Sequence, residues 1–318
     1  MCARACGLVI AMTTDALPAI AERRGPVVRL MAGQTGPVLV VVAVLIVVWY
    51  ASAIWLNTPR QIDLFERQGV EWTNADLVRA TLAQERPLLP APHQIIAEMK
   101  KTILDTRITS KRSLVFHSWV TLSSTLLGFA FGAGLGIVLA VGIVHVRSLD
   151  KSLMPWVISS QTIPILAIAP MVIVVLAAIG LRGLVPKAII SSYLCFFPVT
   201  IGMVKGLRSP DPLQMDLMRT YNASRWQTFW KLRWPSSVPF LFTSLKVAVA
   251  ISLVGAIVGE LPTGASAGLG ARLLAGSYYG QTIQIWSALI TAAVLAALLV
   301  ALVAAIERVT LRHMGIGV

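Results

Sequence analysis

Charged residues are scarce in this sequence. Only 13% of the 318 residues are Asp, Glu, Lys or Arg, whereas 56% are hydrophobic and the mean hydropathy is +0.77. A water-soluble domain usually needs about a quarter of its residues charged to cover its surface. The shortage excludes an ordinary soluble fold of this length and predicts that lipid covers much of the surface.

Cysteine is sparse as well. Cys2, Cys6 and Cys195 have no spacing typical of a disulfide framework or a metal site. The sequence also lacks Gly-x-x-x-x-Gly-Lys-[Ser/Thr], so it does not hold ATP phosphates by that device. We therefore expect no metal or cofactor in this chain, and we assign it no catalytic residue.

Six apolar runs approach the roughly 20 residues that a membrane helix needs. They are Pro37–Leu56, Trp119–Val144, Ser152–Leu181, Ala188–Val204, Phe240–Gly259 and Thr282–Ile306. Pro164 and Pro170 interrupt the third run, and we expect both to break it. The pattern predicts an all-α, polytopic membrane bundle of six transmembrane helices.

The net charge of +13 is distributed mainly between these runs. The basic residues of both tails and of the loops after the second and fourth runs fall on one side of the predicted membrane, which the positive-inside rule makes cytoplasmic. The segment 57–117 on the other side is also basic, but at about 60 residues it is near the length at which the rule loses force. The predicted parts are a cytoplasmic tail (1–36), a first helix (37–56), an external segment (57–117), a five-helix core (118–306) and a C-terminal tail (307–318). Leu89-Pro-Ala-Pro92 predicts the start of a short amphipathic helix within the external segment.

The loop between the fourth and fifth runs, residues 205–239 of the core, is polar and aromatic. Leu213–Tyr221 is expected to form a short helix, and Asn222 tolerates a left-handed turn. Trp226 begins a second helix, in which Phe229 and Trp230 at i+3 and i+4 would complete an exposed apolar stripe, ended by two prolines. A stripe rimmed by basic residues suits a partner protein or an anionic lipid surface, and the pattern alone leaves both open.

This loop resembles the cytoplasmic "EAA" coupling loop of permease subunits of type I ABC importers. Asp216 occupies the Glu position and Asn222 the Gly position, while Leu217 and Met218 replace the two alanines. The resemblance implies contact with an ATPase subunit. The residues assigned to coupling are Asp216, Tyr221, Asn222, Ala223, Arg225, Trp226, Phe229, Pro235 and Pro239.

Further motifs extend the resemblance from Leu89 to the C-terminus and indicate the nitrate/sulfonate/taurine-type branch. They include Thr162-Ile-Pro164, Phe197-Pro198 and Glu260-Leu261…Gly268-Leu-Gly270. That branch also includes permeases for thiamine pyrimidine precursors and riboflavin. The resemblance implies a type I importer fold in the bacterial inner membrane, a homodimer, two cytoplasmic subunits that use ATP and Mg²⁺, and an external solute-binding protein. The transported solute stays open.

Glu260 is the one carboxylate near the interior of a predicted span. Charged groups in membranes are costly and often functional, although a residue at a helix end is also explained by a structural role. The candidates for the translocation pathway are Gln161, Thr162, Pro164, Ser192, Ser252 and Glu260. An alternative function is an ion-coupled secondary transporter in which Glu260 is the coupling site.

Overall fold

The computed structural model describes residues 35–262 and 267–315, and these ranges contain helices and no strand. The all-α prediction is therefore confirmed for the described residues. Two compact units divide between Ala51 and Ser52, inside helix α2 (Thr35–Gln68). Five single helices, α2 among them, are long and apolar enough to cross a membrane, and a sixth candidate is a bent helix pair.

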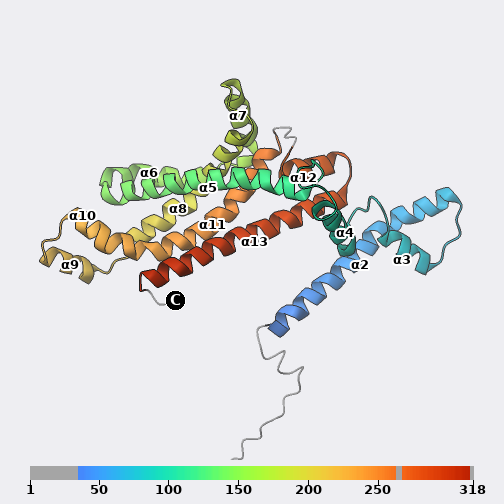
Figure 1. The fold of residues 1–318 in the computed structure, drawn as a ribbon, viewed down its shortest axis with the longest axis horizontal. Coiled ribbons are helices and arrows are strands. Elements are labelled where there is room, and N and C mark those ends of the chain that lie inside the picture. The colour runs from blue at the N-terminus through green and yellow to red at the C-terminus, as the bar shows by residue number, and fades with distance from the viewer. Residues whose placement is uncertain (1–34, 263–266, 316–318) are drawn as a thin grey trace, which may run out of the picture. The chain divides into compact units, whose positions relative to one another are not determined.

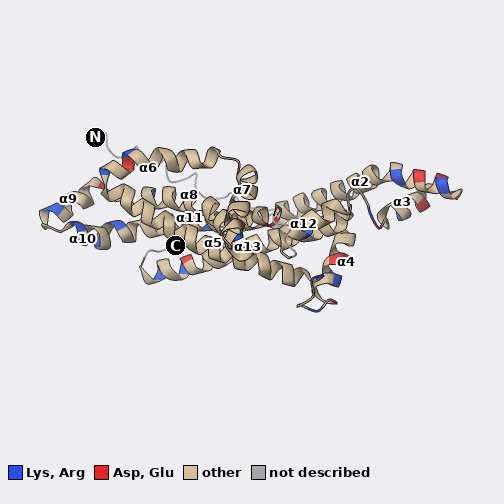
Figure 2. Ribbon diagram, turned by 90° about the horizontal axis from the view of Figure 1, so that it is seen from above, with Lys and Arg blue, Asp and Glu red and all other residues tan. Residues whose placement is uncertain are grey.

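Four long helices form the bundle of the second unit: α5 (Leu114–His145), α8 (Leu184–Leu207), α11 (Trp234–Glu260) and α13 (Thr282–His313). They run alongside one another in Figure 1. Each corresponds to a predicted span and is longer than it. Figure 2 shows these helices largely free of charged residues, as contact with lipid requires.

Glycines allow α5 and α8 to approach closely. A β-carbon at Gly132 would lie 2.7 Å from the carbonyl oxygen of Ser192, and one at Gly136 would lie 2.8 Å from that of Phe196. Small residues permit such contacts between membrane helices. The residue numbers at these contacts increase in the same direction along both helices. Helices α5 and α8 are therefore parallel.

The parallel arrangement shows how the bent pair must be counted. Helix α6 (Arg147–Ser159) and the short 3₁₀ turn η1 (Ser160–Thr162) are followed by α7 (Ile165–Ala178), and the pair is bent by 101°. Because α5 and α8 run in the same direction, the segment between them must return the chain to its starting side. The bent pair therefore counts as one membrane span, which brings the spans among the described residues to six.

Only one of the two prolines breaks this crossing. Ile163, before Pro164, is extended with φ −80° and ψ 120°, because the proline ring disfavours a helical residue before it. Pro170 lies inside α7 without ending it, so the expected second break is wrong. Helix α7 projects from the four-helix bundle in Figure 1.

Helix α11 runs antiparallel to its neighbours α8 and α13. Gly202 of α8 contacts Ser244 of α11, and Gly255 of α11 contacts Ser191 of α8. Lys246 of α11 forms a 2.8 Å ion pair with Glu307 of α13. The bundle therefore has two distinct ends. We call the end that gathers His145, Leu207, Trp234 and His313 the loop end, and the opposite one, which gathers Leu114, Leu184, Glu260 and Thr282, the α12 end.

The predicted external segment is helical and lies at the α12 end. Helix α2 continues to Gln68, beyond the predicted span, and is followed by α3 (Asn74–Leu82) and α4 (Pro92–Ile103). Asn57 is 2% exposed; its amide donates to the carbonyl oxygen of Leu89 at 2.8 Å, and its side-chain oxygen accepts from the backbone of Leu88. The short helix predicted after Leu89-Pro-Ala-Pro92 is confirmed as α4.

Candidate functional site

The loop at the loop end consists of three short helical pieces. They are α9 (Pro212–Thr220), α10 (Arg225–Thr228) and the π-helical turn η2 (Phe229–Arg233), which leads directly into α11. Asp211 caps α9 by accepting the backbone N–H of Leu213 at 2.8 Å. Ser224 and Gln227 form a reciprocal capping box that starts α10. Basic residues gather around α9 and α10 in Figure 2.

Asn222 makes the turn between the two pieces. Its φ of 50° is the one positive value at a non-glycine position within the described part of the chain. Asn is among the few residues other than Gly that adopt this left-handed conformation readily. The predicted turn at Asn222 is thus confirmed, and it explains why this residue substitutes for Gly.

The aromatic side chains of the loop divide into an exposed set and a buried anchor. Tyr221 is 78% exposed and Trp226 is 70% exposed, whereas Phe229 is only 7% exposed. The Phe229 ring packs edge-on against His145 of α5, with 5.2 Å between the ring centroids. The predicted exposed stripe is therefore wrong at Phe229, because this residue packs into the bundle core.

The prolines do not end the second helical piece. Pro235 lies in the first turn of α11 and Pro239 lies within that helix. The π-helical turn lets the backbone N–H of Trp234 reach the carbonyl oxygen of Phe229. The expected break at Pro235 is thus wrong, since the π-helical turn before it absorbs the distortion that a proline causes inside a continuous helix. The loop is consequently continuous with a membrane span.

A basic cavity lies between the loop and α5. Its volume is about 550 Å³, and Arg219, Arg225 and Arg233 line it together with His145. Arg219 also pairs with Asp216 at 2.9 Å, but both side chains are largely exposed. Such exposed pairs contribute little to stability. The loop therefore presents a positively charged surface around exposed aromatic rings.

The predicted pathway residues fall into two groups. Gln161, Thr162 and Pro164 are exposed at the bend between α6 and α7. Ser252 is fully buried, and its hydroxyl donates to the backbone carbonyl oxygen of Thr125 on α5 at 3.0 Å. Ser192 is half-buried on α8. The structure does not bring the six residues together, and their role in transport stays a prediction.

Glu260 forms the centre of a buried polar cluster at the α12 end. Its carboxylate is fully buried and accepts a hydrogen bond from the hydroxyl of Thr121 on α5 at 3.0 Å. The ammonium group of Lys187 on α8 lies 3.5 Å from this carboxylate. The backbone N–H of Gly270 donates a hydrogen bond to the same carboxylate at 2.8 Å. Gly270 belongs to the first turn of α12 (Leu269–Tyr278), where a carboxylate is favourable. One side chain thus joins four helices.

His117 binds the residue that precedes α12, next to this cluster. The backbone N–H of Gly268 donates to its Nδ1 at 2.9 Å, while Nε2 lies 2.9 Å from the carbonyl oxygen of Lys111. Because Nδ1 accepts a hydrogen bond, the geometry assigns the proton to Nε2. Sequence reasoning missed Thr121, Lys187 and His117, since they are far from Glu260 along the chain; the one local signal was the pair Gly268 and Gly270.

The sequence and the fold match known transport proteins. The family model for binding-protein-dependent transport system inner membrane components matches residues 132–315. The formylaminopyrimidine transport permease protein ThiX of Halalkalibacterium halodurans is 31% identical over 61% of this chain and 72% of that protein. The riboflavin transport system permease protein RibX of Chloroflexus aurantiacus is 31% identical over 62% and 71%.

A solved structure shows the same fold. It is the MetNI methionine ABC transporter in inward-facing conformations, with a TM-score of 0.52 at 18% identity, covering 62% of this chain and 95% of that chain. The family match extends over more than half of the present sequence. This chain therefore belongs to the inner-membrane components of binding-protein-dependent transport systems and is a permease subunit of an ABC importer.

Proposed function

We propose that the loop from Pro212 to Arg233 binds a cytoplasmic ATPase subunit and transmits its movement to the membrane helices. The main support for this proposal is that Trp226 and Tyr221 are exposed on a loop that is continuous with α11. Exposed aromatic side chains rimmed by arginine are typical of protein interfaces. ATP and Mg²⁺ would bind to the partner subunit, and this chain would bind no cofactor.

Two contacts support transmission of force from the loop. The first is the π-helical continuity from Phe229 through Trp234 into α11. The second is the packing of the buried Phe229 ring against His145 at the end of α5. A displacement of α10 would therefore act on two spans together. Coupling through such a packed, continuous element requires no flexible hinge at Pro235 or Pro239.

The same proposal assigns the two ends of the bundle. The basic loop and the C-terminal end of α13 share the loop end, which the positive-inside rule makes cytoplasmic together with both chain termini. The α12 end would face the periplasm or the extracellular space, where a solute-binding protein delivers its ligand. The location would be the bacterial inner membrane.

A second copy of the chain would complete the pathway. Met171 and Val174 of α7 are each 68% exposed, and an apolar helix face that projects from a bundle needs lipid or another protein to cover it. We propose a homodimer in which the exposed polar bend at Gln161 and Thr162 contributes to the passage of a small solute. The relatives named above are transporters of formylaminopyrimidine and riboflavin, and the solute here would be of comparable size.

Nothing in the described part of the chain favours the ion-coupled alternative. The carboxylate of Glu260 is fully buried and is bound by Thr121, Lys187 and Gly270. An ion-coupling carboxylate needs access to solvent on at least one side during the cycle.

The test uses the permease co-expressed with its ATPase. Trp226→Ala and Arg225→Glu are expected to abolish co-purification of the ATPase and ATP-dependent uptake, because they remove the exposed ring and reverse the charge beside it. The matched controls are Trp119→Ala and Arg182→Glu, which change an exposed Trp and an exposed Arg at the α12 end. Retained co-purification in the loop variants, or equal loss in the controls, would refute the coupling role.

A further inference from the structure

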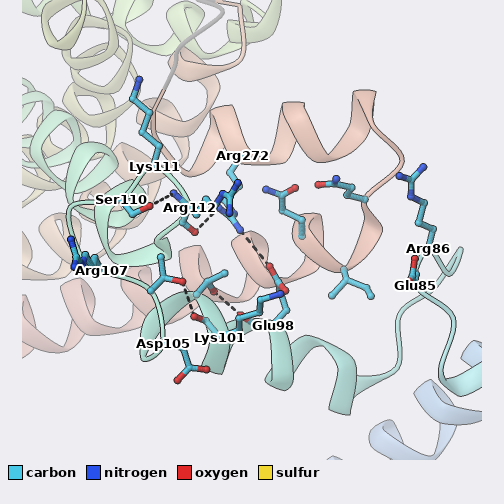
Figure 3. Close-up of a pocket in the computed structure, with 15 residues that line it drawn as sticks. Glu85, Arg86, Glu98, Lys101, Asp105, Arg107, Ser110, Lys111, Arg112 and Arg272 are labelled. Atoms are coloured by element: carbon cyan, nitrogen blue, oxygen red, sulfur yellow. Dashed lines mark hydrogen bonds and ion pairs between the residues drawn. The ribbon is translucent and has the colours of Figure 1, made fainter.

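A second charged cavity lies at the α12 end, away from the coupling loop. Its volume is about 800 Å³ and it is bounded by the turn before α4, by α4 itself, by the segment leading into α5, and by α12 and the start of α13. We call it the Arg272 pocket. Figure 3 shows Arg272 and Glu98 facing each other within it, with Glu85 and Arg86 at its far side.

Basic side chains dominate the Arg272 pocket. The acidic lining residues are Glu85, Glu98 and Asp105. Of these, Glu98 already forms an ion pair with Arg272. The basic lining residues are Arg86, Lys101, Arg107, Lys111, Arg112 and Arg272. The excess of positive charge makes the pocket attractive to an anion.

The incomplete hydrogen bonding of Arg272 is the strongest indication that the pocket binds a ligand. Its side chain is 7% exposed, and its Nη1 donates to the carbonyl oxygen of Arg112 at 2.9 Å. Its Nη2 lies 3.5 Å from Oε1 of Glu98, which is longer than the roughly 2.7–2.9 Å of a good charged hydrogen bond. Its Nε is buried with no hydrogen-bond partner within the described ranges. A buried guanidinium with a weak carboxylate contact and an unused N–H is incompletely satisfied.

The pocket lies at the boundary between membrane and water. Lys111 and Arg112 come just before α5, and Gln281 directly precedes α13, and both helices are membrane spans. Helix α5 has 32 residues and is therefore about 48 Å long, close to the roughly 40–45 Å of a bilayer with its headgroups. The starts of these helices thus reach the headgroup layer.

Exposed apolar side chains occur in the same stretch of chain as the basic lining residues Lys101 and Arg107. Ile96 and Leu104 are 66% and 71% exposed, and Ile108, next to Arg107, is 63% exposed. A segment with exposed apolar residues beside basic ones is suited to lie in the membrane interface. Arginine binds phosphate oxygens through paired, charge-assisted hydrogen bonds, so a basic pocket at the depth of the headgroups suits a lipid phosphate. We propose that the Arg272 pocket binds a phosphate group, and that its source is the headgroup of an anionic phospholipid.

The first experiment compares ligands on the purified full-length chain in neutral detergent. Short-chain phosphatidylglycerol is titrated against short-chain phosphatidylcholine and sodium phosphate, and binding is measured by native mass spectrometry and thermal shift. Phosphatidylglycerol is expected to bind in preference to phosphatidylcholine and to weaken as salt increases. Equal stabilisation by sodium phosphate alone would assign the site to free phosphate. Failure of both anions to bind better than phosphatidylcholine overturns the proposal.

The second experiment locates the binding. The double variant Lys101→Gln/Arg107→Gln removes two exposed charges of the pocket and is expected to weaken phosphatidylglycerol binding about tenfold or more. The matched control is Arg67→Gln/Arg79→Gln, which removes two exposed charges from α2 and α3 outside the pocket and is expected to bind normally. Equal losses in both double variants would mean general electrostatic attraction and would contradict a site at Arg272.

A third variant tests the guanidinium itself. Arg272→Lys keeps the positive charge but removes Nε and the planar arrangement of donors. Binding of phosphatidylglycerol is expected to fall several-fold while helix content, measured by circular dichroism, stays unchanged. Unaltered binding in this variant would exclude Arg272 as a ligand of the phosphate.

Discussion

Lys187 on α8 and Glu260 on α11 form an ion pair with 3.5 Å between Nζ and Oε1, and the two side chains are 8% and 0% exposed. Such a pair is stable only when its remaining hydrogen-bonding groups are satisfied. Thr121 and the N–H of Gly270 satisfy the carboxylate, and the carbonyl oxygen of Ala267 accepts from Lys187 at 3.4 Å. The cluster therefore attaches α12 to the bundle.

Glu260→Gln is expected to destabilise the protein strongly. It leaves the ammonium group of Lys187 buried without a counter-charge, and removal of one partner of a buried pair costs about 3–5 kcal/mol. The measurement is the thermal unfolding of the detergent-solubilised chain. The double variant Lys187→Met/Glu260→Gln should recover part of the loss, whereas Asp216→Asn, in an exposed pair, should change nothing measurable. An unchanged unfolding temperature for Glu260→Gln would show that the cluster does not hold α12.

Gly268→Ala is expected to destabilise the same end by a different route. Gly268 has φ 126° and ψ 161°, a conformation essentially restricted to glycine, and an added β-carbon would also overlap the carboxylate of Glu260. Gly280→Ala is the control for an open position, because Gly280 has φ 63°, which alanine tolerates better, and nothing within 4 Å of an added β-carbon. The control should lose only the roughly 1–2 kcal/mol of backbone strain. Similar unfolding temperatures for the two variants would exclude the steric contact with Glu260.

Two glycines of α5 should respond to alanine in opposite directions. At Gly132 the β-carbon would lie 2.7 Å from the carbonyl oxygen of Ser192, so α8 must move away, at a cost of about 1–3 kcal/mol. At Gly134 an added β-carbon meets nothing within 4 Å, and alanine gains about 1 kcal/mol of helix propensity. Thermal unfolding measures both. A loss of stability at Gly134 equal to that at Gly132 would contradict the close contact of α5 with α8.

The turn at Asn222 gives a prediction for coupling. Asn222→Gly should preserve co-purification of the ATPase, because Gly adopts φ 50° without strain. Asn222→Val should lose co-purification, since a β-branched residue is strongly disfavoured at positive φ and α10 would be displaced. The two variants are compared by pull-down at matched expression. Equal recovery of the ATPase with both would show that the conformation of this turn is unimportant for docking.

Local features were predictable from the sequence wherever neighbouring residues decide them. Pro164 breaks the third span because proline restricts the residue before it, and Asn222 turns the loop because its side chain tolerates positive φ. Pro170 and Pro235 were misread because a proline also fits within a helix whose neighbours absorb the distortion. The π-helical turn before α11 provides that adjustment at Pro235.

The apolar runs and the basic loops of this sequence determined by themselves that the chain is a membrane helical bundle. They also determined that a polar, aromatic loop joins the fourth and fifth runs. Only the tertiary structure decided that Phe229 is an anchor rather than part of the exposed surface, and that Glu260 meets Thr121 and Lys187. The physical reason is distance along the chain. Span length and turn conformation depend on adjacent residues, whereas the burial of a ring or the partner of a carboxylate depends on which helices pack together.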